Sequence, residues 1–88
     1  MTSSVSYSIK IKGSVARTLR RIDAHERTRL VAAIDRLAQE PSAGAALKGE
    51  FGGLRRLRVG RYRIIYEAFH EELTILVVRI GHRREVYR

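Results

Sequence analysis

The chain contains no cysteine, no tryptophan, a single proline and only nine acidic residues among 88. Without cysteine it has no disulfide, no thiolate nucleophile and no cysteine-ligated zinc or iron–sulfur site, which suits the reducing cytoplasm. The longest apolar run is residues 30–34, far below the ~20 residues that span a bilayer, so we expect no membrane segment. Residues 1–6 lack the basic flank and apolar stretch of a secretory signal. We therefore expect a cytoplasmic protein.

Basic residues outnumber acidic residues by two to one. Eighteen lysines and arginines give a formal net charge of +9, and the isoelectric point is near 11.1. So much charge on a small body creates a strong positive potential and indicates a polyanionic partner. The content of 44% hydrophobic and 31% charged residues is typical of a globular domain. The length allows one core, which predicts a single domain over residues 1–88.

The first half of the chain predicts one strand and two helices. Apolar and polar residues alternate over residues 5–11, as in a strand with one buried face. Apolar residues then recur at helical spacing over 15–22, with Ser14 as the expected N-cap. A second apolar stripe covers 30–38, preceded by Asp23 and Glu26 in a capping-box pattern and ended by Pro41. These two helices should form a hairpin.

The second half predicts a loop and three strands. Glycine, alanine and serine predominate over residues 41–53, which indicates a connection back to the sheet. Strand patterns follow at 54–59, 62–69 and 73–80, and the links at 60–61 and 70–72 are short enough for hairpins. The predicted fold is α+β, with an N-terminal strand, a two-helix hairpin and a three-stranded antiparallel meander. Both helices should cover one sheet face and leave the other open.

Five arginines and no acid lie between residues 54 and 66. Alternation places Arg56 and Arg58 on one face of their strand and Arg55 on the other. Any one of these side chains could simply be solvated, but counterion release rewards several guanidinium groups placed together, so the cluster indicates phosphate binding. The arginines that we expect to contact RNA phosphates are Arg55, Arg58, Arg61, Arg84 and Arg88.

The sequence offers little to a metal or a nucleotide cofactor. The acids are scattered and the three histidines form no ligand motif. The glycines of segment 49–53 match neither the P-loop nor the dinucleotide fingerprint. We therefore expect no metal and no cofactor. The chemistry that remains is metal-free attack on a phosphodiester by the 2′-hydroxyl of RNA itself.

Such a reaction needs charge stabilisation and proton transfer. A guanidinium stays protonated and can hold a pentavalent phosphate through paired hydrogen bonds, which makes Arg56, Arg63 and Arg83 candidates for the first task. For proton transfer the C-terminal stretch offers His82, Tyr87 and, as a third candidate, Glu85; histidine is the side chain that titrates nearest to neutral pH. The plain alternatives are a surface histidine after a strand and a core tyrosine that reaches solvent.

Two segments carry a family resemblance, Gly-Arg-Tyr-Arg-Ile-Ile-Tyr at 60–66 and Gly-His-Arg-Arg-Glu-Val-Tyr at 81–87. The predicted order is a strand, a helical hairpin, a loop with Leu-Lys-Gly at 47–49 and arginine-rich strands. Together with these two segments, this order makes nearly the whole chain resemble the RelE/ParE toxin superfamily, on its RelE side. The resemblance implies a toxin of a type II toxin–antitoxin system that cleaves mRNA in the ribosomal A site without metal. Its partners would be the ribosome, mRNA and an acidic RelB-like antitoxin in a hetero-oligomer.

The resemblance also implies residue roles. Arg56 matches a basic residue on the strand that faces the RNA, and Arg63 matches the arginine after the tyrosine in the hairpin. Arg83 matches the transition-state stabiliser or acid. Tyr87 matches a tyrosine that stacks on or orients the substrate, and His82 stands where the best-known type has lysine and would share proton transfer. Two alternatives stay open: a ParE-like toxin that inhibits DNA gyrase and cuts no RNA, and a relic that only binds antitoxin.

Overall fold

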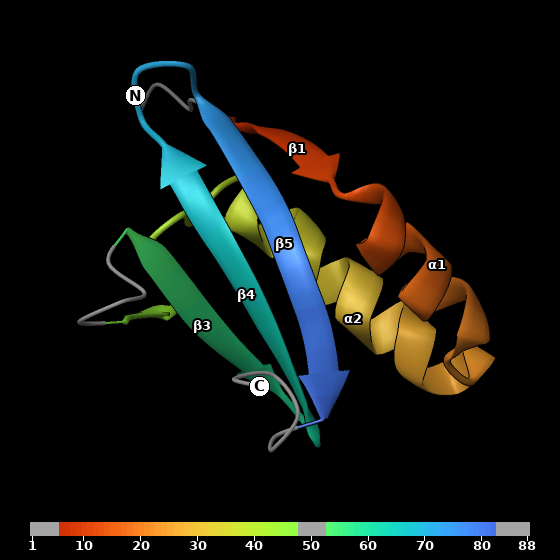
Figure 1. The fold of residues 1–88 in the computed structure, drawn as a ribbon. Helices are drawn as coiled ribbons and strands as arrows, with labels where there is room; N and C mark the ends of the chain where they lie inside the picture. The colour runs from red at the N-terminus through yellow and green to blue at the C-terminus, as the bar shows by residue number, and fades with distance from the viewer. Residues whose placement is uncertain (1–5, 48–52, 83–88) are drawn as a thin grey trace.

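The computed structural model describes residues 6–47 and 53–82 (Figure 1). Its elements are β1 (Ser8–Ile11), α1 (Gly13–Arg21), α2 (Ala24–Leu37), β2 (Ala45–Ala46), β3 (Leu54–Val59), β4 (Tyr62–Phe69) and β5 (Thr74–His82). The strands form one sheet in the order β1-β5-β4-β3-β2, in which β1 runs parallel to β5 and the other neighbours are antiparallel. This confirms the predicted α+β fold. Within the described residues, no helix is long and apolar enough to cross a membrane.

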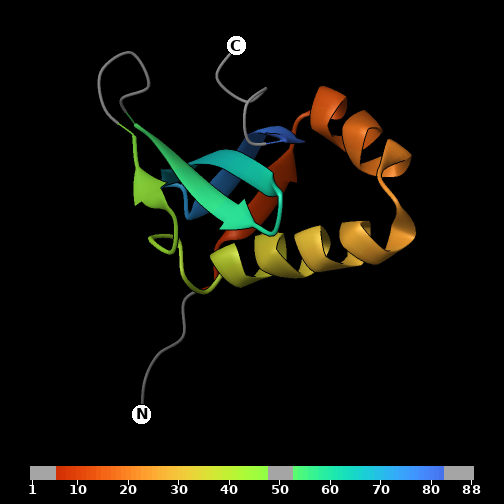
Figure 2. The ribbon, with the colours of Figure 1, turned by 90° about the horizontal axis from the view of Figure 1, so that it is seen from below.

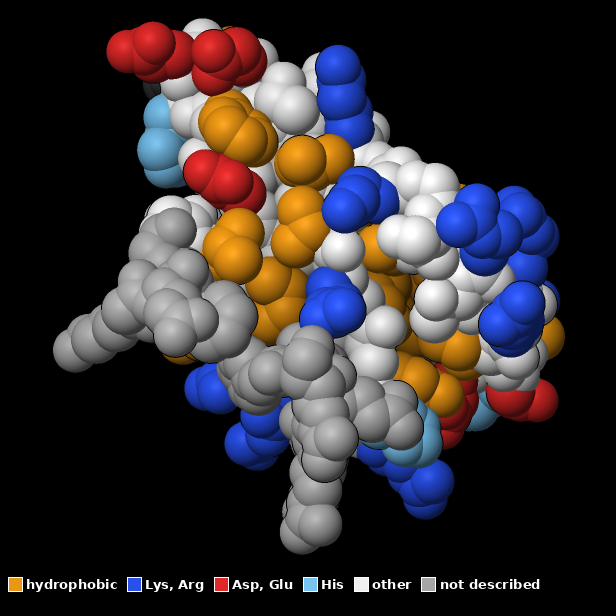
Figure 3. All heavy atoms as spheres, viewed as in Figure 1, with side chains coloured by type: hydrophobic (Ala, Val, Ile, Leu, Met, Phe, Trp, Pro, Cys, Tyr) orange, Lys and Arg blue, Asp and Glu red, His pale blue; other side chains and the backbone are white. Residues whose placement is uncertain are grey.

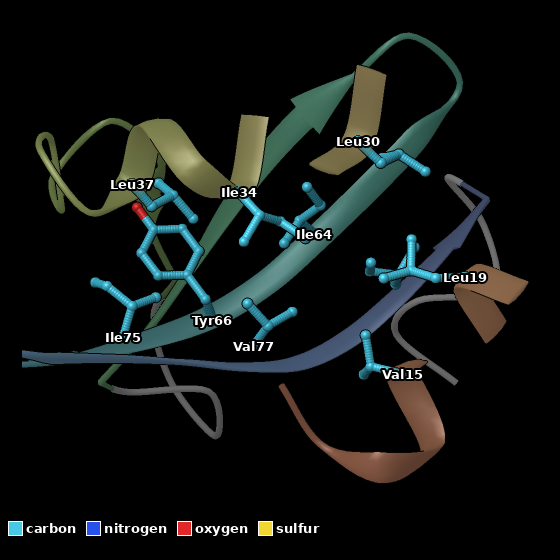
Figure 4. Packing of buried hydrophobic residues seen from close by; sticks show 10 residues of the cluster. Val15, Leu19, Leu30, Ile34, Leu37, Ile64, Tyr66, Ile75 and Val77 are labelled. Atoms are coloured by element: carbon cyan, nitrogen blue, oxygen red, sulfur yellow. The ribbon is translucent and has the colours of Figure 1, made fainter. Parts of the chain in front are cut away.

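The core lies between the two helices and one face of the sheet. Both helices lie on one side of the strands, with α1 against β5 and α2 near β3 (Figure 2). Apolar side chains at helical spacing on α2 meet inward-facing side chains of β4 and β5 (Figure 4). Each such side chain contributes roughly 1.5–3 kcal/mol when fully buried. The cluster comprises Val15, Leu19, Leu30, Ile34, Leu37, Ile64, Tyr66, Ile75, Val77 and Ile80. Among residues 6–47 and 53–82, no helix covers the other sheet face, as predicted.

The two helix starts differ from each other. Asp23 caps α2 as predicted, and its carboxylate accepts a hydrogen bond from the backbone N–H of His25 at 3.1 Å. The prediction that Ser14 caps α1 is wrong, because the helix already begins at Gly13 and Lys12 holds the cap position without a side-chain bond. The Lys12 carbonyl accepts from the N–H of Val15 at 2.9 Å, so the helical ladder starts before Ser14 can act as a cap.

Three strand boundaries also differ from the prediction. The last strand begins at Thr74 instead of residue 73, because Leu73 has a φ of 51° and completes the turn after β4. It also continues to His82, two residues beyond the predicted end. The first strand begins at Ser8. The backbone N–H of Tyr7 donates a hydrogen bond to the Ala38 carbonyl at 2.8 Å, and so it does not pair with a neighbouring strand. Residue 5 lies outside the described residues.

The predicted loop over 41–53 contains the short strand β2, which a buried tyrosine holds in place. The Tyr66 hydroxyl donates to the Pro41 carbonyl at 2.7 Å and accepts from the Gly44 N–H at 2.9 Å. A Cβ at Gly44 would lie 2.7 Å from the Arg56 carbonyl, so only glycine fits there. The next residue, Ala45, pairs with Arg56 and starts β2. Tyr66 thus fixes the edge of the sheet next to β3.

Candidate nucleic-acid interface

The sheet face away from the helices carries arginines in two neighbouring rows. Register places Arg56, Ile65 and Arg79 side by side across β3, β4 and β5, and it places Arg58, Arg63 and Gly81 in the next row. Residues paired in register point to the same side of a sheet. Ile64 and Tyr66 are buried beneath the helices, so these two rows face the opposite way. We call Arg56, Arg58, Arg63 and Arg79 the arginine patch.

Arg79 belongs to the patch because β5 contains a β-bulge. Ile65 pairs with Arg79 but Tyr66 pairs with Val77, so Val78 is the extra residue. Without this bulge, the alternation that buries Val77 would also turn Arg79 into the core and Ile80 outward. With it, Ile80 is only 7% exposed and Arg79 is exposed to solvent. The spacing of apolar positions 75, 77 and 80 is the sequence signal of this shift.

Arg58 and Arg63 lie directly opposite each other on β3 and β4. Like charges in that arrangement destabilise a sheet by roughly 0.2–1 kcal/mol. Moreover, Arg63 Nε is buried and has no hydrogen-bond partner among the described residues. A buried polar group left unpaired costs about 1–3 kcal/mol. A bound anion would offset both costs, which makes this pair the strongest indication of a phosphate site on the open face.

On the open face, basic and acidic side chains lie toward opposite ends of the strands. Figure 3 shows hydrophobic side chains in its centre, basic side chains around them and acidic side chains gathered over the turn between β4 and β5. Glu67 faces this side between Leu54 and Leu76, and the turn itself contains Glu71 and Glu72. A polyanion on this face is therefore attracted to the arginine end and repelled from the turn.

The structure does not place His82 with the arginine patch. His82 pairs with Tyr62 in register, and their rings meet edge-on with centroids 4.7 Å apart. Tyr62 packs against the core, so the His82 ring lies on the helix side of the sheet. Burial, and then the nearby carboxylate of Glu26, raise the pKa of Tyr62 above its ordinary 10.0. Only the backbone brings His82 close to the patch, through its neighbour Gly81, which pairs with Arg63.

The other predicted site residues are divided between three places. Arg55 pairs with Tyr66 and therefore points to the helix side, as the alternation predicts. Arg61 lies in the turn between β3 and β4, exposed to solvent. Four predicted residues, Arg83, Arg84, Tyr87 and Arg88, lie outside the described residues. The sequence shows Arg79 as one of several C-terminal arginines but assigns it no site role, because the bulge that turns it outward has only a weak signal in the sequence.

Acidic and histidine side chains do not converge on a metal site in the described part of the chain, where no group of three or more is placed to hold an ion.

Comparison with known proteins decides the family. The model of the family described as "ParE toxin of type II toxin-antitoxin system, parDE" matches residues 9–87. The chain belongs to this toxin family. The resemblance to the RelE/ParE superfamily is thereby confirmed.

Relatives of the toxin carry RelE names. It is 36% identical to Toxin RelG of Mycobacterium tuberculosis (strain ATCC 25618 / H37Rv) over 53 residues, which is 59% of this chain and 61% of RelG. Its fold matches a chain of the toxin–antitoxin complex RelBE2 from M. tuberculosis with a TM-score of 0.83 and 25% identity, covering 97% of the toxin and 100% of that chain. A chain of the archaeal RelE–RelB complex from Pyrococcus horikoshii OT3 matches with a TM-score of 0.76 and 26% identity. The match covers 92% of this chain and 99% of the archaeal chain. Both of these solved structures are complexes of a toxin with its antitoxin.

Proposed function

We propose that the toxin is a ribosome-dependent endoribonuclease that cleaves mRNA in the A site without a metal ion and so inhibits translation. The observation that carries this proposal is the opposed pair Arg58 and Arg63 on the open face, with a buried, unpartnered Nε on Arg63. Such a pair suits a phosphate, and RNA is a polyanion that presents phosphates in series. The RelE names of the relatives support the same direction.

In the proposed reaction, the 2′-hydroxyl of the RNA attacks the adjacent phosphorus while a base removes its proton. The P–O5′ bond breaks, an acid protonates the leaving oxygen, and a 2′,3′-cyclic phosphate remains. Guanidinium groups of Arg56 and Arg63 stabilise the charge that builds on the phosphorane oxygens. Arg83 and Tyr87 act as stabiliser and substrate-orienting ring. The His82 ring contacts Tyr62 on the helix side of the sheet, so His82 shares proton transfer only if its ring leaves that contact. The ribosome presents the mRNA, so free RNA should be cleaved poorly.

The test is primer extension on mRNA from a reconstituted translation reaction. Wild-type toxin should produce cuts in phase with codons, and a reaction without ribosomes should produce none. Arg63→Ala and Arg83→Ala should abolish the cuts, whereas Arg20→Ala, a change on the exposed last turn of α1, should leave them intact. A folded, antitoxin-free wild-type toxin that leaves ribosome-bound mRNA whole would refute the proposal.

A second candidate function is inhibition of DNA gyrase without RNA cleavage. The observation in its favour is that the matching family model is that of the ParE toxin. A supercoiling assay with purified gyrase separates the two functions. Inhibition of gyrase together with intact mRNA would establish the second candidate, and unaffected supercoiling together with codon-phased cuts would establish the first.

A further inference from the structure

A row of apolar and acidic side chains lies beside the arginine patch on the open face. Register places Leu54, Glu67 and Leu76 side by side across β3, β4 and β5. On β4 this row is separated from Arg63 by Ile65. Because positions two apart on a strand lie about 7 Å from each other, Glu67 is about 14 Å along β4 from Arg63. We call Leu54, Glu67 and Leu76 the outer row.

Apolar surface continues from the arginine patch to the outer row. Ile65 lies between them, and it is only 4% exposed although it does not belong to the core cluster beneath the helices. Leu54 and Leu76 remain partly exposed, and Figure 3 shows an acidic side chain bordered by hydrophobic ones on this face. The outer row therefore offers a flat, apolar group a surface to lie on, next to one carboxylate.

The Glu67 carboxylate has no partner within the described residues, where it makes neither a hydrogen bond nor an ion pair. A Cβ at Gly53 would lie 3.4 Å from the Oε2 atom of Glu67, so the carboxylate rests against the start of β3. Lys10 extends the outer row onto the edge strand β1, but it lies two strands away from Glu67, about 10 Å across the sheet. An ionised carboxylate accepts hydrogen bonds and donates none. It is thus available to a donor group of a ligand.

This chemistry favours a base over a phosphate at the outer row. A carboxylate repels the negative charge of a phosphate. It accepts hydrogen bonds from an exocyclic amino group, such as that of cytosine, whereas uracil has an acceptor oxygen at the same position and is repelled. Single-stranded RNA presents these base edges to proteins. A nucleotide with its phosphate at Arg63 can therefore place its ribose over Ile65 and its base on the outer row.

We propose that Glu67 determines base specificity: it accepts a hydrogen bond from the amino group of an RNA base whose phosphate is held by Arg58 and Arg63. The toxin thereby favours cytosine, adenine and guanine over uracil at that position. The inference rests on the proposed function for its ligand, RNA, but the base contact itself requires no cleavage. Glu67 is thus a specificity-determining residue and takes no part in the transfer of protons.

The test compares two RNA analogues of equal length and charge that differ in the edge of the base. It uses full-length toxin and fluorescein-labelled homopolymers of deoxycytidine and of deoxyuridine, each about six nucleotides long. A homopolymer presents the same base at every position, so the result does not depend on register. The missing 2′-hydroxyl removes the nucleophile, so binding is measured without cleavage. Affinity is measured by fluorescence anisotropy at neutral pH.

Two charge-matched variants are compared with wild type. Glu67→Gln keeps the shape of the side chain, but its amide both donates and accepts, so it no longer rejects the edge of uracil. Glu72→Gln is the control, because it removes the same charge from an exposed position in the turn between β4 and β5. Circular dichroism verifies that each variant is folded.

Wild-type toxin should bind the cytidine homopolymer about fivefold or more tightly than the uridine homopolymer, the lower bound for one specific base contact. In Glu67→Gln this ratio should fall below about twofold. Glu72→Gln should strengthen the binding of both homopolymers alike and keep the wild-type ratio. An unchanged ratio in Glu67→Gln, equal affinities in wild type, or no saturable binding of either homopolymer would each overturn the proposal.

Failure of this proposal and failure of the proposed function are separate outcomes. A cytidine preference that depends on Glu67, together with intact ribosome-bound mRNA, would support the base contact and refute the nuclease. Codon-phased cuts by a toxin that binds both homopolymers equally would support the nuclease and overturn the role of Glu67.

Discussion

At the scale of the residue, Arg63 and Tyr66 show opposite uses of two positions on the same strand, β4. Arg63 points to the open face with an Nε that no described residue satisfies. Tyr66 points into the core, where its hydroxyl is fully engaged by the Pro41 carbonyl and the Gly44 N–H. The first suits a ligand, and the second stabilises the fold. Substitutions at the two positions should therefore affect different measurements.

Tyr66→Phe should lower the free energy of unfolding by about 1–3 kcal/mol, because it leaves the Gly44 N–H and the Pro41 carbonyl without their partner. Urea denaturation at neutral pH measures the difference. A loss below about 0.5 kcal/mol would show that water replaces the hydroxyl at no cost.

Tyr66 should also contribute to alkaline destabilisation. Burial raises the pKa of Tyr66 above its ordinary 10.0, an effect that the Gly44 N–H and Arg55 partly oppose. The folded protein thus holds this proton more tightly than the unfolded chain, so the stabilisation is complete below about pH 10 and is lost as pH rises through the folded-state pKa. The free energy of unfolding should fall more steeply above about pH 10 in wild type than in Tyr66→Phe. Parallel pH profiles would contradict this.

At the scale of the element, the sequence predicts most boundaries because its signals are local. Alternation is sufficient to place Arg56 and Arg58 on one side of β3, and a capping residue is sufficient to start α2 at Asp23. The positions of Arg79 and His82 depend on contacts distant in sequence. A bulge opposite Ile65 turns Arg79 outward, and the ring of Tyr62 holds His82 on the helix side. The spacing of apolar positions 75, 77 and 80 is only a weak local signal of the bulge, and no local pattern specifies the contact between His82 and Tyr62.

The two helix starts provide a direct comparison. Asp23→Ala should cost about 0.5–2 kcal/mol of stability, because its carboxylate satisfies the His25 N–H at the start of α2. Ser14→Ala should change stability by less than about 0.5 kcal/mol, because Ser14 lies inside α1 and makes no side-chain cap. Thermal or urea denaturation measures both. A cost at Ser14 equal to that at Asp23 would restore Ser14 as the cap.

The turn between β3 and β4 provides a second comparison. Gly60 has a φ of 61°, in the first position of a two-residue hairpin, where an L side chain is strained. Gly60→Ala should therefore destabilise by roughly 1–2 kcal/mol, although its Cβ would meet the Arg29 guanidinium only at an ordinary 3.7 Å. Gly13→Ala, in the first turn of α1, should stabilise by about 0.4–1 kcal/mol. Effects of the same sign would contradict these backbone arguments.

At the scale of the whole molecule, a formal charge of +9 draws any polyanion to the surface, so affinity alone does not identify the site. What distinguishes the arginine patch is its arrangement, with two opposed arginines at one end of the open face and acids at the other.

The salt dependence of RNA binding should show whether RNA contacts the arginine patch or is attracted only by the net positive charge of the protein. For a short single-stranded RNA, removing one phosphate contact reduces the slope of log affinity against log salt by about 0.7. Arg58→Ala and Arg63→Ala should each show this reduction, and Arg20→Ala should not. An equal reduction in all three variants would mean that the RNA has no defined position on the open face.

The most direct test of the central claim is a charge-matched comparison of cleavage rates. Single-turnover cleavage of ribosome-bound mRNA is measured for wild type, Arg63→Lys and Arg20→Lys, all of which have the same net charge. Lysine retains the charge but loses the paired hydrogen bonds of the guanidinium, so Arg63→Lys should cleave about tenfold to a hundredfold more slowly, with Arg20→Lys at the wild-type rate. Equal rates for all three proteins would contradict a phosphate site at Arg63.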